Sequence, residues 1–121
     1  MVATMKKVLA LTAVCEACTG VALLIVPSHV GQLLFDEQFA GVTIPVARMM
    51  GIALIALALA CWPGPPIIGV LTYGALATLY LAYLGFEDGL VGVLLWPAVA
   101  LHMLLTVLLS FEIVRARRNS S

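Results

Sequence analysis

Four long apolar runs constrain the fold of this chain more than any other feature. They cover residues 8–26, 44–62, 67–84 and 90–114. A helix needs roughly 20 mostly apolar residues to cross a bilayer, and each run is close to or above that length. Hydrophobic residues make up 64% of the chain and its mean hydropathy is +1.17, whereas soluble domains hold roughly 45–50% apolar residues. The sequence therefore predicts an all-α integral membrane four-helix bundle, with residues 1–121 forming one domain.

Proline and glycine mark the ends of these runs. Pro27 closes the first run because proline cannot continue a helix interior. Residues 63–66 (PGPP) predict a tight turn after the second run, and Gly85 closes the third. Pro97 lies inside the fourth run, so we expect a kink there and a freed backbone carbonyl.

The connection over residues 28–43 has a pattern of its own. Its apolar residues fall near one face of a helix, with polar residues beside them: Val30, Leu33, Leu34 and Phe35 on the apolar side, and Gln32, Asp36 and Glu37 next to it. Such a short amphipathic segment is typical of a helix that lies in the membrane interface. An ordered loop packed on the bundle is the alternative.

Charged residues are few, balanced and segregated. The chain has six basic and six acidic residues. Five of the basic residues lie near the ends, Lys6, Lys7, Arg115, Arg117 and Arg118, while four of the acids, Asp36, Glu37, Glu87 and Asp88, lie in connections between runs. The positive-inside rule then predicts a multi-pass protein of the inner (plasma) membrane with both termini in the cytoplasm. No basic block is large enough to indicate a nucleic-acid partner.

Glu16 is the residue that most needs an explanation, because it lies about halfway along the first run. A charge at that depth costs at least ~2.5–3.5 kcal/mol on insertion scales. With a rise of ~1.5 Å per residue, Glu16 lies about 13 Å from Lys7, and His102 lies about 19 Å from Arg115. Both estimates place the side chains near the middle of the membrane, so we expect a polar partner for Glu16 on another helix.

Two more polar residues can reach the same level. Tyr80 lies at a similar depth in the third run, and Arg48 can extend inward from the outer end of the second. We hypothesise that Glu16, Arg48, Tyr80 and His102 converge in one buried ligand or proton site, surrounded by Thr12, Thr19 and Thr106. The alternative is a polar cluster that only fixes helix register, in which Arg48 anchors the outer interface and neutralises Glu16.

Three cysteines, Cys15, Cys18 and Cys61, lie inside apolar runs. An odd number in that setting argues against an extracellular disulfide framework. Cys15 and Cys18 are neighbours on one helix, but a bridge between them would distort the backbone, and buried cysteines usually behave as small apolar residues. We expect no cofactor, no bound metal and no catalytic residue.

Two family resemblances follow from these residues. Gly20 and Pro27 at the end of the first helix, the amphipathic connection, and residues 48–51 (RMMG) opening the second helix resemble the DoxX-like group of small bacterial four-helix membrane proteins. That resemblance implies a bacterial inner-membrane location and little about activity.

The layout is also similar to that of the small multidrug resistance transporters, which have four helices and one glutamate midway along the first. Here that glutamate is Glu16, within residues 15–20 (CEACTG). The resemblance implies a site where protons and cationic substrates compete. The chain departs from that family in lacking its aromatic-rich second and third helices, and its charged termini argue against dual insertion.

The sequence therefore favours an accessory or small-ligand-binding membrane protein without an enzyme active site. One alternative is a proton-coupled carrier of small amphipathic or cationic molecules that works as a dimer. Another is a redox or quinone-linked membrane enzyme that uses His102, Tyr80 and the cysteines. The expected partners are the lipid bilayer and a second copy or a larger membrane complex.

Overall fold

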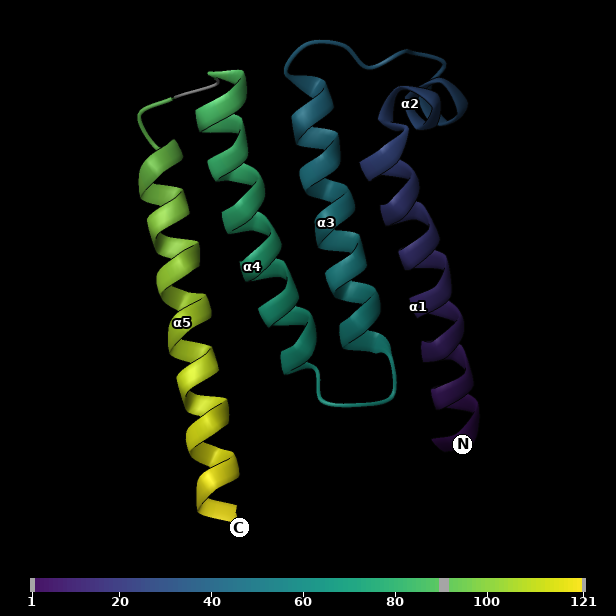
Figure 1. Cartoon of the computed structure of the whole chain (residues 1–121). Helices are drawn as coiled ribbons and strands as arrows, with labels where there is room; N and C mark the ends of the chain where they lie inside the picture. The colour runs from purple at the N-terminus through teal and green to yellow at the C-terminus, as the bar shows by residue number, and fades with distance from the viewer. Residues whose placement is uncertain (1, 90–91, 121) are drawn as a thin grey trace. The chain divides into compact units, whose positions relative to one another are not determined.

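The structure, a computed structural model, describes residues 2–89 and 92–120 and contains no strand within them. Its helices are α1 (Val2–Ile25), α2 (Pro27–Phe35), α3 (Thr43–Cys61), α4 (Ile67–Tyr83) and α5 (Leu95–Ser120), and a π-helical turn (Leu84–Asp88) continues α4 (Figure 1). Four of these helical segments are long and apolar enough to cross a membrane. The predicted all-α class with four spanning helices is confirmed, and the chain is a membrane protein.

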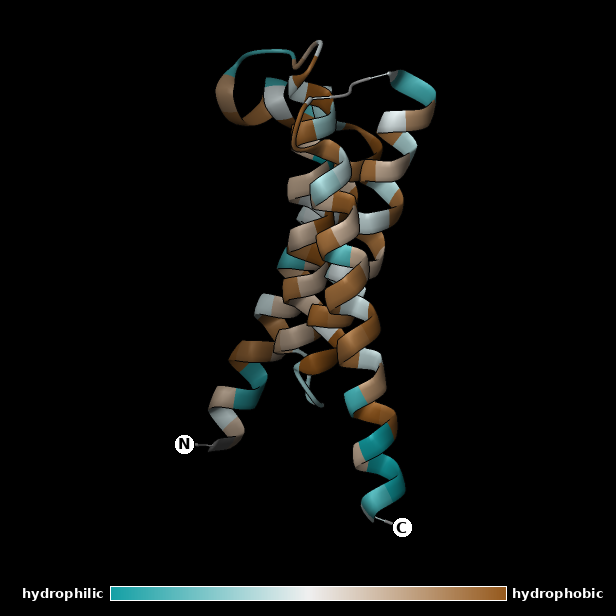
Figure 2. Cartoon of the chain, turned by 90° about the vertical axis from the view of Figure 1, so that its left-hand side faces the viewer, coloured by the Kyte–Doolittle hydropathy of each residue, from teal (hydrophilic) through white to brown (hydrophobic). Residues whose placement is uncertain are grey.

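Hydropathy along each helix agrees with this assignment. Apolar residues cover the middle of the long helices, and polar residues gather toward the C-terminal end of α5 (Figure 2). Lys6 and Lys7 are exposed in the first turns of α1. On α5, the Arg115 Nη1 and Glu112 Oε1 atoms are 4.0 Å apart, and both side chains are exposed, so they form an ordinary surface ion pair.

The chain divides into two compact units, Met1–Val70 and Leu71–Ser121. In the first unit, α1 and α3 run antiparallel side by side (Figure 1). Their backbones meet at two glycines: a Cβ added to Gly20 would lie 2.7 Å from the Gly51 carbonyl oxygen, and one added to Gly51 would lie 2.6 Å from the Gly20 carbonyl oxygen. Small residues allow this approach, which drives helix association where lipid weakens the hydrophobic effect. Ala13 and Ala47 are buried on these two helices.

The connection between α1 and α3 contains the amphipathic helix that the sequence allowed. Pro27 begins α2. The first N–H groups of a helix have no intrahelical acceptor, so the lack of an N–H in proline costs no hydrogen bond there. Asp36 ends the helix with φ 56°, a left-handed conformation that aspartate tolerates. Its carboxylate accepts a hydrogen bond of 2.7 Å from the Gln32 amide. Leu33 stays exposed, as expected for a helix that lies in the membrane interface.

The turn over residues 63–66 leads into α4, whose first residues still belong to the first unit. A Cβ on Gly69 would lie 2.5 Å from the Ala56 carbonyl oxygen and 2.8 Å from the Ala60 Cβ. The start of α4 therefore packs at Gly69 against Ala56 and Ala60, two alanines at four-residue spacing on α3.

In the second unit, α4 and α5 form a helical hairpin. Gly74 faces the hydroxyl of Thr106, and a Cβ on Gly85 would lie 2.8 Å from the Trp96 ring. The Phe86 and Trp96 rings meet edge to face at 4.9 Å between centroids. Gly89 ends the π-helical turn with φ 63°, a conformation that glycine adopts without strain.

The last helix differs from its prediction. Residues 90–91 of the predicted helix lie outside the described part of the chain, Gly92–Leu94 are not helical, and α5 begins only at Leu95. Pro97 therefore lies in the first turn rather than in the interior. The first N–H groups of a helix have no intrahelical acceptor, so proline there removes no hydrogen bond. The predicted kink at Pro97 is wrong for this reason.

Candidate functional site

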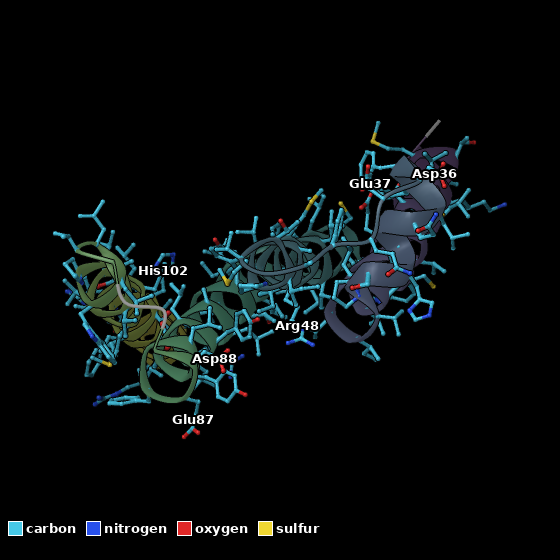
Figure 3. The ribbon with its side chains drawn as sticks, turned by 90° about the horizontal axis from the view of Figure 1, so that it is seen from above. Asp36, Glu37, Arg48, Glu87, Asp88 and His102 are labelled. Carbon is cyan, nitrogen blue, oxygen red and sulfur yellow. The ribbon has the colours of Figure 1, made fainter. Side chains whose placement is uncertain are left out.

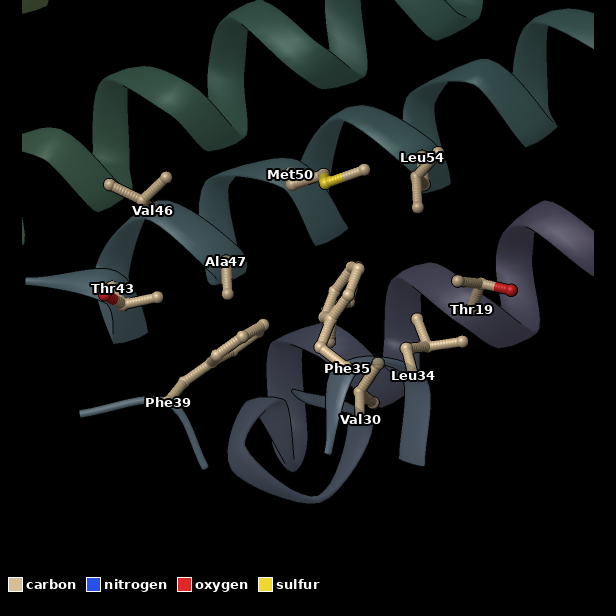
Figure 4. A pocket seen from close by; sticks show the side chains of 11 residues that line it. Thr19, Val30, Leu34, Phe35, Phe39, Thr43, Val46, Ala47, Met50 and Leu54 are labelled. Carbon is tan, nitrogen blue, oxygen red and sulfur yellow. The ribbon is translucent and has the colours of Figure 1, made fainter. Parts of the chain in front are cut away.

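An apolar pocket of about 230 Å³ lies in the first unit between α1, α2 and α3 (Figure 4). We call it the α2 pocket. Two of its residues come from α1, four from α2 and the segment after it, and five from α3: Thr19, Leu23, Val30, Leu34, Phe35, Phe39, Thr43, Val46, Ala47, Met50 and Leu54. Only the two threonines carry a hydroxyl.

Local contacts hold the α2 segment in place over this pocket. The Ser28 hydroxyl donates a hydrogen bond of 2.9 Å to the Phe39 carbonyl, eleven residues later. Gly31 lies so close to the returning chain that a Cβ would be 2.7 Å from the Glu37 carbonyl oxygen and 2.8 Å from the Phe39 ring. This close approach brings the Phe35 and Phe39 rings to 6.2 Å between centroids, and both rings line the pocket.

The pocket offers little hydrogen bonding at its α1 wall. The Thr19 hydroxyl donates to the Cys15 carbonyl at 2.9 Å. Threonine in a helix often bonds to the carbonyl four residues earlier, and its hydroxyl hydrogen is then no longer available. Apart from Thr43, the rest of the lining is aliphatic, aromatic or thioether, so the pocket suits a hydrocarbon ligand.

Glu16 lies one turn of α1 before Thr19. Its spacing from Ala13 and Gly20 places it on the same face as these two buried residues. The side chain is half-buried, and among residues 2–89 and 92–120 it has neither an ion-pair nor a hydrogen-bond partner. Glu16, the residue of α1 with the highest cost of burial in a membrane, is therefore near the α2 pocket but does not line it.

Arg48 projects from α3 on the turn before Gly51 (Figure 3). Because Gly51 packs against Leu23 and Leu24, Arg48 lies near the end of α1, about two turns or 10 Å along the axis from Glu16. Within the described part of the chain, its Nε atom is buried without a hydrogen-bond partner. Among the described residues, Glu16 and Arg48 make no ion pair, and neutralisation of Glu16 by Arg48 at longer range stays a prediction.

His102 and Tyr80 belong to the second unit and take different partners. The His102 Nδ1–H donates a hydrogen bond of 2.8 Å to the Ala98 carbonyl oxygen, because a carbonyl oxygen can only accept. The ring meets Tyr73 edge to face at 5.8 Å. The Tyr80 and Tyr83 rings stack with 6.2 Å between centroids. The Tyr80 hydroxyl is buried without a hydrogen-bond partner among the described residues.

The remaining members of the predicted cluster bond within their own helices. The Thr12 hydroxyl donates to the Val8 carbonyl at 2.9 Å, and the Thr106 hydroxyl donates to the His102 carbonyl at 2.7 Å. Convergence of Glu16 and Arg48 with Tyr80 and His102 concerns both units and stays a prediction.

The cysteines are free thiols. Cys15 and Cys18 are exposed on α1, and Cys61 is half-buried at the end of α3. Within residues 2–89 and 92–120, no three side chains of the His, Cys, Asp and Glu types gather closely enough to hold a metal ion.

Sequence reasoning missed the α2 pocket because it searched the chain for ionisable residues. The one available signal was the amphipathic pattern of residues 30–35, which now supplies one wall. Comparison with known proteins found no matching family model, characterised protein or solved structure. Function is therefore argued from the site alone.

Proposed function

We propose that this membrane protein binds a small apolar or amphipathic molecule in the α2 pocket. The observation that carries the proposal is the pocket itself: an apolar hollow between two spanning helices, covered at one end by a short helix that internal contacts hold in place. Ligand sites are typically concave and mostly apolar. A binding or accessory role needs no catalytic group, which agrees with the apolar lining.

The proposal includes a location in the plasma membrane with both termini in the cytoplasm. It is supported by the basic residues before the first span and after the last one, together with acidic residues in the connections. The α2 pocket would then lie in the outer leaflet. The resemblance to DoxX-like proteins and an assembly with further copies stay predictions.

Thermal unfolding tests the binding proposal. The protein is purified in glyco-diosgenin, a detergent whose rigid steroid body is poorly shaped for a narrow pocket. Lauroyl lysophosphatidylcholine, dodecylamine and pyrene are then added separately. A ligand that binds only the folded protein at 100 times its Kd stabilises it by about 2.7 kcal/mol and so raises Tm.

The control is Ala47→Phe, which fills the pocket from the α3 wall and is expected to abolish the rise in Tm. Val46→Phe serves the same purpose at an exposed position, in case Ala47→Phe does not fold. The proposal fails if no probe raises the Tm of the natural sequence, or if the filled variants respond equally.

A proton-coupled carrier is the second candidate, and the unpartnered Glu16 favours it. A half-buried carboxyl group one turn from the pocket is a natural place for a proton and a cation to compete. Vesicles with an imposed proton gradient and ethidium as substrate test this. Uptake should be lost in Glu16→Gln and kept in Glu112→Gln, whose carboxylate is exposed. Absence of uptake by the natural sequence would remove the carrier hypothesis.

A further inference from the structure

The α2 pocket is open along one side. Three of its wall residues, Phe35, Val46 and Met50, remain 66%, 62% and 58% exposed. Val46 and Met50 belong to a helix that is long and apolar enough to cross a membrane, so within the first unit we expect their exposed surfaces to adjoin the hydrocarbon of the bilayer. A ligand can therefore enter sideways from the membrane without passing through water.

The dimensions of the pocket favour a slender ligand. Its volume of about 230 Å³ is below the roughly 300–1,000 Å³ typical of sites for drug-sized molecules. On α3 the lining extends from Thr43 to Leu54, a rise of about 16 Å. A long and thin space of this kind fits one unbranched chain better than a fused ring system.

The two ends of the pocket differ in chemistry. At the Thr19 end the only hydroxyl is committed to the Cys15 carbonyl. At the Thr43 end, the pocket lies beside the exposed α2–α3 connection, where Asp36 and Glu37 are also exposed. A ligand with one apolar and one polar end is therefore oriented, with its polar end at Thr43 and its apolar end at Thr19.

We propose that the α2 pocket holds one acyl chain of a phospholipid from the surrounding leaflet. The terminal methyl group lies toward Thr19, and the headgroup lies at the interface beside α2. The inference rests on the proposed function and narrows it to a ligand class. The leaflet is the source because the open side of the pocket runs along a spanning helix.

Alkylation of a single cysteine measures occupancy directly. Met50→Cys is made in a background where Cys15, Cys18 and Cys61 are alanine, and the protein is kept in glyco-diosgenin. Lauroyl lysophosphatidylcholine should slow its reaction with N-ethylmaleimide about tenfold at a concentration near ten times Kd, since about a tenth of the sites are then empty. Pyrene, an apolar ring system, should not slow the reaction. Leu57→Cys, on α3 outside the pocket, should react at the same rate throughout.

The outcomes separate the two proposals. Protection by the lysolipid but not by pyrene supports the acyl-chain site, and adding Val46→Phe should remove that protection. Protection by pyrene alone overturns the acyl-chain inference and leaves the proposed binding function standing. If neither probe protects Met50→Cys, the acyl-chain inference fails, and the proposed binding function then depends on whether any probe raises Tm. Equal protection at Leu57→Cys means that the lysolipid coats the helices without a site, which also overturns the inference.

Discussion

The α1–α3 pair and the α4–α5 pair both pack through glycines, but each pair places a different kind of atom against them. In the first pair, backbone meets backbone at Gly20 and Gly51, and neither side has room for a methyl group. In the second pair, glycine backbone meets a side chain: Gly74 faces Thr106, and Gly85 faces Trp96. Side chains can rotate or be shortened, whereas helix backbones cannot. The first contact should therefore tolerate substitution less well than the second.

The largest effect is expected for Gly51→Ala. Its Cβ would lie 2.6 Å from the Gly20 carbonyl oxygen and 3.1 Å from the Leu24 nitrogen, both backbone atoms. Overpacking of this kind lowers the free energy of unfolding by about 2–3 kcal/mol. Unfolding in mixed micelles, followed by circular dichroism, measures it. A loss below that of Gly74→Ala would contradict the comparison.

Gly74→Ala should lower the free energy of unfolding by less, about 1 kcal/mol, because the new methyl group clashes with the Thr106 hydroxyl and makes only ordinary contact with the His102 carbonyl oxygen. The double variant Gly74→Ala with Thr106→Ala should recover most of that loss, since the obstructing hydroxyl is gone. The same unfolding assay applies. No recovery in the double variant would show that the two residues do not face each other.

Glu16→Gln should leave the free energy of unfolding unchanged or raise it by up to about 1 kcal/mol. The structure gives Glu16 no ionic partner among the described residues, and removing a charge from a membrane helix lowers the cost of burying it. Arg48→Gln is the matched variant. If each single change is strongly destabilising and the double change is no worse, the two side chains form an ion pair after all.

Pro97→Ala should have the smallest effect, within about 0.5 kcal/mol, because proline in a first turn removes no backbone hydrogen bond. The expected change in helix direction is also negligible. A loss of several kcal/mol, or a shift in the distance between spin labels on α5, would favour an interior position for this proline.

Sequence reasoning located the spanning helices because length and hydropathy decide whether a segment can cross a bilayer. It missed the start of α5 because Val93 and Leu94 are apolar but exposed and outside the helix. An apolar turn near a membrane surface looks the same in composition as the first turn of a spanning helix. Only the position of Pro97, which suits a helix beginning, offered a correction.

The site was harder to predict than the fold. The α2 pocket depends on a hydrogen bond from Ser28 to Phe39 and on the absence of a side chain at Gly31. Neither contact follows from periodicity, because each joins residues across an irregular segment. Glu16 lies in the interior of α1, but its position along the helix gives no direction around the helix axis, so its partner stays a prediction.

Hydroxyl groups on the helices have a consequence for how the protein reaches its membrane. Five of them, all on spanning helices, donate to the carbonyl four residues earlier in the same helix: Thr12, Thr19, Thr78, Thr106 and Ser110. A helix whose hydroxyl groups are bonded to its own backbone can pass from the translocation machinery into lipid by itself, before the next helix of the chain has been inserted. Insertion and helix association can then proceed as separate stages. Glu16 on α1 and the Nε atom of Arg48 on α3 have no hydrogen-bond partner among the described residues, so these two helices carry the largest cost of entering lipid alone.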